Sequence, residues 1–244
     1  MKKRLWVVLI LLAASGLAVA DEADQPDEEP YPEVSGSIGF GFTAATGNTE
    51  SAATRLRATT TLDYERWRHR FSVSAFHNEE DGTSTADRRS GSAQSDLRIS
   101  EHAYLFANVN GERDRFGSFE RRYSGSLGIG RRFVDTTAME LDLEVGGGRR
   151  YKRAQGGDDT DSEGIGRFHG IYAWRITPHT TFIQDVEVEA GSDNTYTESE
   201  TEVRSRLTTN LSWTLSYVIK RNSQVPEGTE RTDTFTAVTL DYAF

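Results

Sequence analysis

The sequence predicts an all-β fold, an antiparallel transmembrane β-barrel of about twelve strands. Three observations predict it: apolar and polar residues alternate from Val34 onward, polar connectors separate the alternating segments, and the chain ends on the aromatic Phe244. Because successive side chains of a strand point to opposite faces of its sheet, this alternation gives each strand one apolar and one polar face.

The alternation divides the chain into candidate strands. The clearest is 51–64, where Leu56 and Leu62 lie on one face and Arg55 and Arg57 on the other. We expect strands near 33–44, 51–64, 67–78, 87–99, 102–112, 121–133, 137–150, 164–176, 180–190, 199–209, 212–221 and 232–244.

Two of these segments have an ambiguous phase, 87–99 and 102–112. In the second, Leu105 and Val109 compete with Tyr104 and Phe106 for the apolar face. The sequence leaves both phases open.

The predicted connectors alternate in length. Short ones are expected at 64–67, 100–102, 134–136, 177–179 and 210–211, and longer ones at 77–87, 111–120, 152–163, 191–199 and 221–232. Tight periplasmic turns and longer outer loops are typical of outer-membrane barrels. An even number of strands places both barrel termini on the periplasmic side.

The first twenty residues read as a signal peptide. Basic residues at 2–4 precede an apolar run at 5–14, and Ala18-Val-Ala20 is a small-residue cleavage site. The run is shorter than the ~20 residues that a spanning helix needs. We therefore expect residues 1–20 to be removed near Ala20 after export, 21–32 to form an acidic disordered leader, and 33–244 to form the barrel.

Composition excludes several function classes. The net charge of −10 disfavours nucleic-acid binding. The absence of cysteine excludes disulfides, thiolate metal sites and a thiol nucleophile. The mean hydropathy of −0.60 does not argue against a barrel, because only every second strand residue faces lipid. We predict no cofactor, and we interpret the acidic stretch 152–163 as a solvated loop and not as a calcium site.

Charged residues on the polar faces are predicted to line the lumen, because each would cost about 2–4 kcal/mol at the lipid midplane. These residues are Arg55, Arg57, Arg68, Arg70, Glu140, Asp142, Glu144, Arg167, Arg175, Asp185, Glu187, Glu189, Arg204 and Arg206. Acidic and basic rows alternate on successive strands, from the row 140–144 to the row 204–206. We expect them to form cross-strand pairs.

The C-terminus carries Leu240, Tyr242 and Phe244 at steps of two. This pattern resembles the assembly signal of bacterial outer-membrane proteins, which implies the barrel-assembly machinery as a partner. The predicted lipid-facing surface implies outer-membrane lipids and lipopolysaccharide as further partners.

Short motifs resemble one family. Val34-Ser-Gly-Ser-Ile-Gly-Phe-Gly-Phe42, Thr46-Gly-Asn-Thr-Glu50, Gly125-Ser-Leu-Gly-Ile-Gly130 and the closing segment 231–244 are similar to the salt-induced outer-membrane proteins, which are defined by a domain of unknown function. The resemblance covers roughly residues 33–244. It implies an outer-membrane barrel without an established activity and supplies no catalytic residues.

Three functions remain open at this point. The favoured one is a structural barrel or narrow pore with a charged lumen. The second is a lipid-modifying enzyme, with His77 at the outer rim, and the third is a secreted soluble β-sandwich that binds other molecules. We predict no enzyme, because a nucleophile needs a positioned base and a group that orients it, and no such set is visible around the five histidines.

Overall fold

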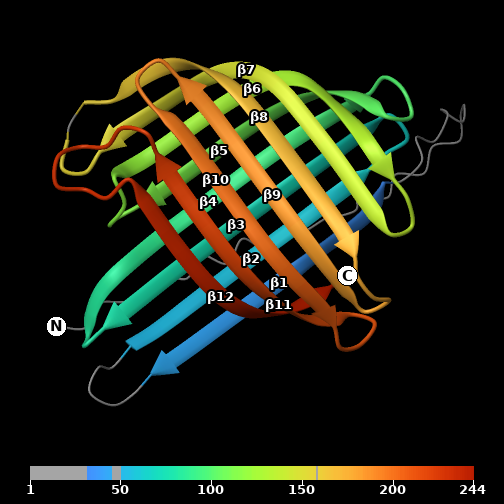
Figure 1. Ribbon diagram of the computed structural model, residues 1–244, viewed down its shortest axis with the longest axis horizontal. Coiled ribbons are helices and arrows are strands. Elements are labelled where there is room, and N and C mark those ends of the chain that lie inside the picture. Colours follow the sequence, from blue (N-terminus) through green and yellow to red (C-terminus); the bar gives the residue numbers. More distant parts are fainter. Residues whose placement is uncertain (1–31, 46–50, 158) are drawn as a thin grey trace, which may run out of the picture. The chain divides into compact units, whose positions relative to one another are not determined.

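A computed structural model describes residues 32–45, 51–157 and 159–244. They form one closed antiparallel barrel in which each strand pairs with its sequence neighbours and β1 pairs with β12 (Figure 1). The strands are β1 (Glu33–Ala45), β2 (Ser51–Asp63), β3 (Trp67–Glu80), β4 (Thr83–Arg98), β5 (Ala103–Asp114), β6 (Phe119–Asp135), β7 (Met139–Ala154), β8 (Asp161–Arg175), β9 (Thr180–Gly191), β10 (Thr195–Arg206), β11 (Leu211–Asn222) and β12 (Thr232–Ala243). The predicted twelve-stranded barrel is confirmed.

Several predictions fall outside the described residues: the signal peptide 1–20, nearly all of the leader 21–32, and the turn motif 46–50. The described residues contain no helix that is long and apolar enough to cross a membrane.

The barrel has its apolar side chains outside and its polar side chains inside. Leu56, Val73, Val145 and Leu240 are about half exposed on the outer face. The buried residues are mostly polar or charged, and Arg150 is fully buried. This arrangement is the reverse of a soluble core, and the single closed sheet overturns the alternative of a β-sandwich.

The connectors do not alternate in length as strongly as predicted. The strands run further than the pattern suggested, so the expected loop 77–87 is only the turn Asp81-Gly82, and the expected loop 191–199 is only 192–194. Both Asp81 and Gly82 have positive φ, which suits a two-residue hairpin turn. We call the end that carries Glu33 and Ala243 the turn end, and the opposite end, with connectors such as 155–160 and 223–231, the loop end.

The sequence left open which face of β5 points inward. Glycines on the neighbouring strand β6 are the physical reason for the orientation observed. Tyr104 and Phe106 point inward and are buried, whereas Leu105 and Val109 face outward. Tyr104 is in register with Gly130, where an added Cβ would lie 2.2 Å from the tyrosine ring. The glycine-rich segment of β6 therefore leaves room for two aromatic rings inside the barrel.

The predicted terminal signal lies at the seam that closes the barrel. Leu240 is in register with Phe40 and Tyr242 with Ile38. The Phe244 amide donates to the Gly36 carbonyl, and the Gly36 amide donates to the Phe244 carbonyl, each at 3.0 Å. The last residue thus hydrogen-bonds the first strand.

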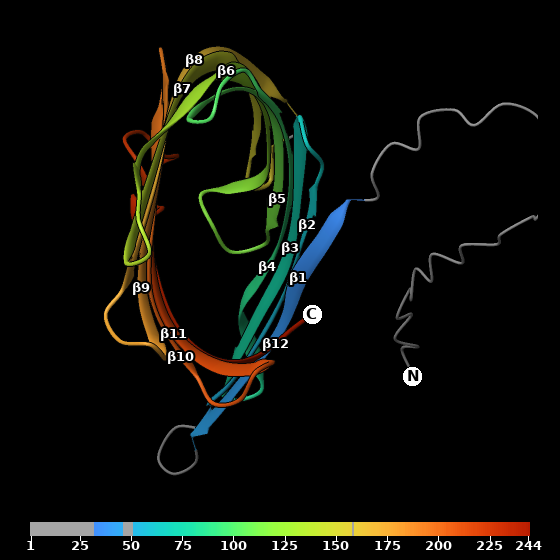
Figure 2. The same cartoon turned by 90° about the vertical axis from the view of Figure 1, so that its right-hand side faces the viewer.

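The ring of strands is flattened. Figure 2 shows it longer in one direction than in the other, with β2–β5 forming one long wall and β9–β11 the opposite one. Flattening brings side chains of opposite walls within reach of each other, and this determines the geometry of the lumen.

Candidate functional site

The lumen is crossed by two layers of charged side chains. In the layer nearer the loop end, Glu112 on β5 accepts a hydrogen bond from Lys220 on β11, which lies on the opposite wall. Arg122 is 3.4 Å from the same carboxylate, and its guanidinium stacks 3.3 Å from the centre of the Tyr196 ring. Arg88 completes the layer through its ion pair with Asp114.

Glu144 on β7 is the centre of the second layer, in the half nearer the turn end. Its carboxylate is 2.7 Å from Arg167 on β8 and 3.3 Å from Arg70 on β3. It also accepts hydrogen bonds from the Gln94 amide at 2.7 Å and the Tyr104 hydroxyl at 2.9 Å. Glu144 is only 2% exposed, so these partners replace the water that its charge has lost.

A third set of ion pairs joins β2 to β10 across the short dimension of the barrel. Arg55 lies 2.8 Å from Glu200, and Arg57 lies 2.8 Å from Glu202. These strands are not neighbours in the sheet, so the pairs act as struts between the two walls.

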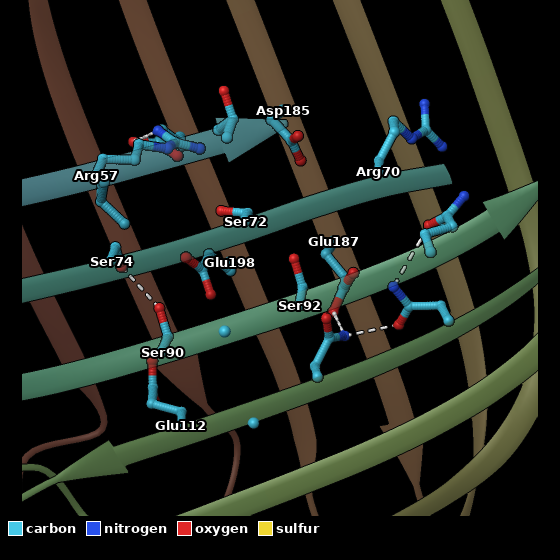
Figure 3. A pocket seen from close by; sticks show the side chains of 18 of the residues that line it. Arg57, Arg70, Ser72, Ser74, Ser90, Ser92, Glu112, Asp185, Glu187 and Glu198 are labelled. Carbon is cyan, nitrogen blue, oxygen red and sulfur yellow. Dashed lines mark hydrogen bonds and ion pairs between the residues drawn. The ribbon is translucent and has the colours of Figure 1, made fainter. Parts of the chain in front are cut away.

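A cavity of about 460 Å³ lies between the two layers. One of its walls carries serine hydroxyls flanked by arginines such as Arg57 and Arg70, and Ser74 and Ser90 hydrogen-bond there at 2.7 Å (Figure 3). The facing wall carries the carboxylates of Asp185, Glu187 and Glu198 together with basic side chains such as Arg167 and Lys220. This volume is within the range that holds a small molecule.

The mouth at the turn end is basic. A second cavity of about 800 Å³ lies there and is lined by Arg175, Arg204, Arg206 and His179. No acidic side chain lines this mouth in the described part of the chain. Predicted lumen arginines from β8 and β10 therefore meet at one opening.

Arg150 forms the most buried ionic group. Its guanidinium is 2.8 Å from Glu163 on β8 and 3.2 Å from Glu189 on β9. It also donates to the main-chain carbonyl of Asn194. The loop predicted at 152–163 is shorter than expected. Its last residue, Glu163, belongs to β8 and points inward to Arg150.

The structure places the predicted lumen charges in three groups. Those in the interior network are Arg55, Arg57, Arg68, Arg70, Asp142, Glu144, Arg167, Asp185, Glu187 and Glu189. Arg175, Arg204 and Arg206 line the basic mouth. Glu140 shares the face of Asp142 but is exposed at the start of β7.

The predicted pairing of neighbouring rows is only partly observed. Arg167 does bind Glu144 and Glu187 on the flanking strands. In contrast, Asp142 pairs with Arg132 on β6, and Arg204 pairs with Glu202 on its own strand. The physical reason is local, because Arg132, on the other neighbour of β7, is in register with Asp142, and Glu202 lies two residues from Arg204 on the same face of β10.

Sequence reasoning missed half of this network. Glu200 and Glu202 lie within the predicted strand 199–209 and share the period-two phase of Arg204, so their inward direction was readable, although only the arginines of this strand were predicted as lumen charges. Glu112 and Asp96 lie on the two strands whose phase was ambiguous. Lys220 follows the phase of its strand and pairs with Glu198 on β10 at 3.4 Å, but neither residue was among the predicted lumen charges.

The histidines have separate roles. His169 bridges Glu144 at 3.3 Å and Asp185 at 3.0 Å inside the lumen. His77 faces outward, 3.8 Å from Glu79, and no serine hydroxyl bonds to it among the described residues. The described residues also hold no group of three acidic or histidine side chains that could bind a metal.

An apolar outer face, a closed sheet and a polar, charged interior define the class of transmembrane β-barrels. The outer-membrane channel from Pseudomonas putida F1 named COG4313 has this fold, with a TM-score of 0.52 and 12% identity over 91% of this chain and all of that one. The NanC porin is similar at a TM-score of 0.48 and 11% identity, over 86% of this chain and 98% of that one.

The chain belongs to the family described as "Protein of unknown function, DUF481", whose model matches residues 38–244. It is 27% identical to the uncharacterized protein YdiY of Escherichia coli K12 over the full length of both chains. The family assignment and the resemblance found in the sequence agree in one respect. Both indicate a family that is defined by a domain of unknown function.

Proposed function

We propose that the protein is a narrow outer-membrane pore for small polar solutes, inserted after export through the periplasm. The observation that carries the proposal is the polar lumen, in which a cavity of about 460 Å³ lies between two charged layers. If the side chains inside the barrel served only to stabilise the fold, apolar side chains would stabilise it more than ion pairs do. Buried ion pairs contribute little net stability.

The basic residues at the turn-end mouth lead us to propose that the pore is selective for anions. Arg175 and Arg206 raise the local concentration of anions at the turn end, since no carboxylate is among the residues that line this cavity in the described part of the chain. Small anions therefore pass more readily than cations of the same size.

Planar-bilayer recording tests the pore. The full-length purified protein should give small, discrete current steps, and a salt gradient should produce a reversal potential that favours anions. Arg175→Gln together with Arg206→Gln should move that potential toward zero. Absence of current above that of the lipid alone would overturn the proposal in favour of a purely structural barrel.

A paired variant tests the constriction. Glu112→Ala with Lys220→Ala removes both partners of the strut that crosses the loop-end layer, and Arg122 and Glu198, which contact them, each lose one opposite charge. Single-channel conductance should rise. Ser92→Ala, which lines the cavity without a charge, is the matched control and should conduct like the wild type.

Localisation and assembly are proposed from the same features. The C-terminal residues Leu240, Tyr242 and Phe244 would be read by the assembly machinery, and deletion of Phe244 should lower the amount of barrel in outer-membrane fractions. Induction by salt, which the family resemblance implies, is a separate proposal that transcript measurement at two salt concentrations tests.

A further inference from the structure

A row of arginines crosses the outer face of four neighbouring strands at the loop end. Arg89 on β4 is in register with Arg113 on β5, Arg113 with Arg121 on β6, and Arg121 with Arg153 on β7. We call these four residues the arginine row. Like charges placed directly opposite each other on adjacent strands are destabilising, so the row needs anions.

The protein supplies few anions to the row. Glu120 lies between three of its members, 2.6 Å from Arg153, 3.4 Å from Arg113 and 3.6 Å from Arg121. Arg89 is 3.5 Å from Asp87, and the same carboxylate is 3.5 Å from Arg115. Among the described residues, two carboxylates therefore serve five guanidinium groups, and Arg89 remains 74% exposed.

Aromatic and apolar residues lie next to the row on its turn-end side. Tyr123 and Tyr151, which are in register with each other, are outward-facing and lie two residues nearer the turn end than Arg121 and Arg153. The outward-facing Val109 lies two residues nearer the turn end than these tyrosines. Apolar residues, then aromatic rings, then basic groups is the order from the hydrocarbon core of a bilayer to its headgroups.

Among the described residues such a row is present on one wall only, because the opposite wall has the single exposed Arg221 on β11, in register with Thr197. At the loop end of β9 and β10, on the opposite long wall, the outward positions are Ala190, Thr195 and Thr197. A general attraction to an anionic surface would not need neighbouring guanidinium groups on one side only. Arg149, also exposed on β7, lies four residues nearer the turn end than Arg153 and is not part of the row.

We infer that the arginine row binds the phosphate groups of a phosphorylated lipid in the leaflet at the loop end, with its acyl chains against the apolar band below. Guanidinium groups bind phosphate through paired hydrogen bonds, and several groups in a line match a headgroup that carries more than one phosphate. The site lies outside the lumen and is independent of the proposed pore.

The test compares lipids that differ only in phosphate. The full-length protein is placed in phosphatidylcholine nanodiscs that contain either bisphosphorylated lipid A or the same lipid A without phosphates, and retained lipid is measured by native mass spectrometry. The wild type should retain the phosphorylated form. Arg113→Gln, Arg121→Gln and Arg153→Gln together should weaken retention by about tenfold or more.

The control removes the same charge elsewhere. Arg66→Gln, Arg131→Gln and Arg221→Gln are exposed positions outside the row and should leave retention unchanged. Equal loss in both triple variants would overturn the site, as would equal retention of both lipids by the wild type. Competition by inorganic phosphate at the same phosphorus concentration would show a free-anion site instead. Bilayer current of the row variant should match the wild type, so failure of this inference is separate from failure of the pore.

Discussion

Arg150 and Arg149 are adjacent in the chain and lie in opposite environments. Arg150 points into the lumen, is fully buried and has two carboxylates and main-chain carbonyls as partners. Arg149 points outward and is exposed. The same contrast holds between the lumen network and the arginine row. Inside the barrel the protein provides the counter-charges, whereas outside it leaves them to be supplied by the membrane.

The largest expected effect comes from the inner member of this pair. Arg150→Met leaves Glu163 and Glu189 buried without their principal partner, which should lower the free energy of unfolding by about 3–5 kcal/mol. Urea unfolding in lipid vesicles, followed by the heat-dependent shift on an electrophoresis gel, measures the change. Arg149→Met is the matched control on the same strand and should unfold like the wild type. Equal destabilisation by both variants would contradict the comparison.

A smaller loss is expected at the turn-end layer. Glu144→Gln keeps the size of the side chain but removes the charge that Arg70 and Arg167 share. Because other carboxylates, Asp96 and Glu187, still contact these arginines, the loss should be about 2–3 kcal/mol. The same unfolding assay applies. A loss as large as that of Arg150→Met would show that the layer depends on Glu144 alone.

The difference between these regions also explains what the sequence could predict. Period-two alternation reports which face a residue belongs to, so the inward direction of Glu144 and Arg167 was readable from it. It carries no information about the shape of the ring, and therefore the struts from Arg55 and Arg57 to β10 could not be foreseen. The arginine row was missed for another reason. Its members depend on strand register and on extension of β5 and β7 beyond the predicted ends, which adds Arg113 and Arg153.

A double-mutant cycle on a strut sharpens the account of the lumen. Arg55 and Glu200 are each 14% exposed and lie on opposite walls. Arg55→Met, Glu200→Gln and the double variant should give a coupling free energy of about 1 kcal/mol, between the values for exposed and buried pairs. Unfolding of the four proteins measures it. A coupling near zero would mean that flattening is set by the β-sheet, with no contribution from the strut.

The smallest effect on stability, and the sharpest on binding, is expected outside the barrel. Glu120 is the carboxylate that three members of the arginine row share, so Glu120→Gln removes a negative charge from the place where we infer a lipid phosphate. Unfolding should change least of all the variants, because the arginines there can turn to solvent or headgroups. Retention of bisphosphorylated lipid A should increase, since the phosphate no longer competes with the carboxylate. Weaker retention would mean that Glu120 is needed to hold the arginines in place, and the row would then be a network closed within the protein, like the lumen.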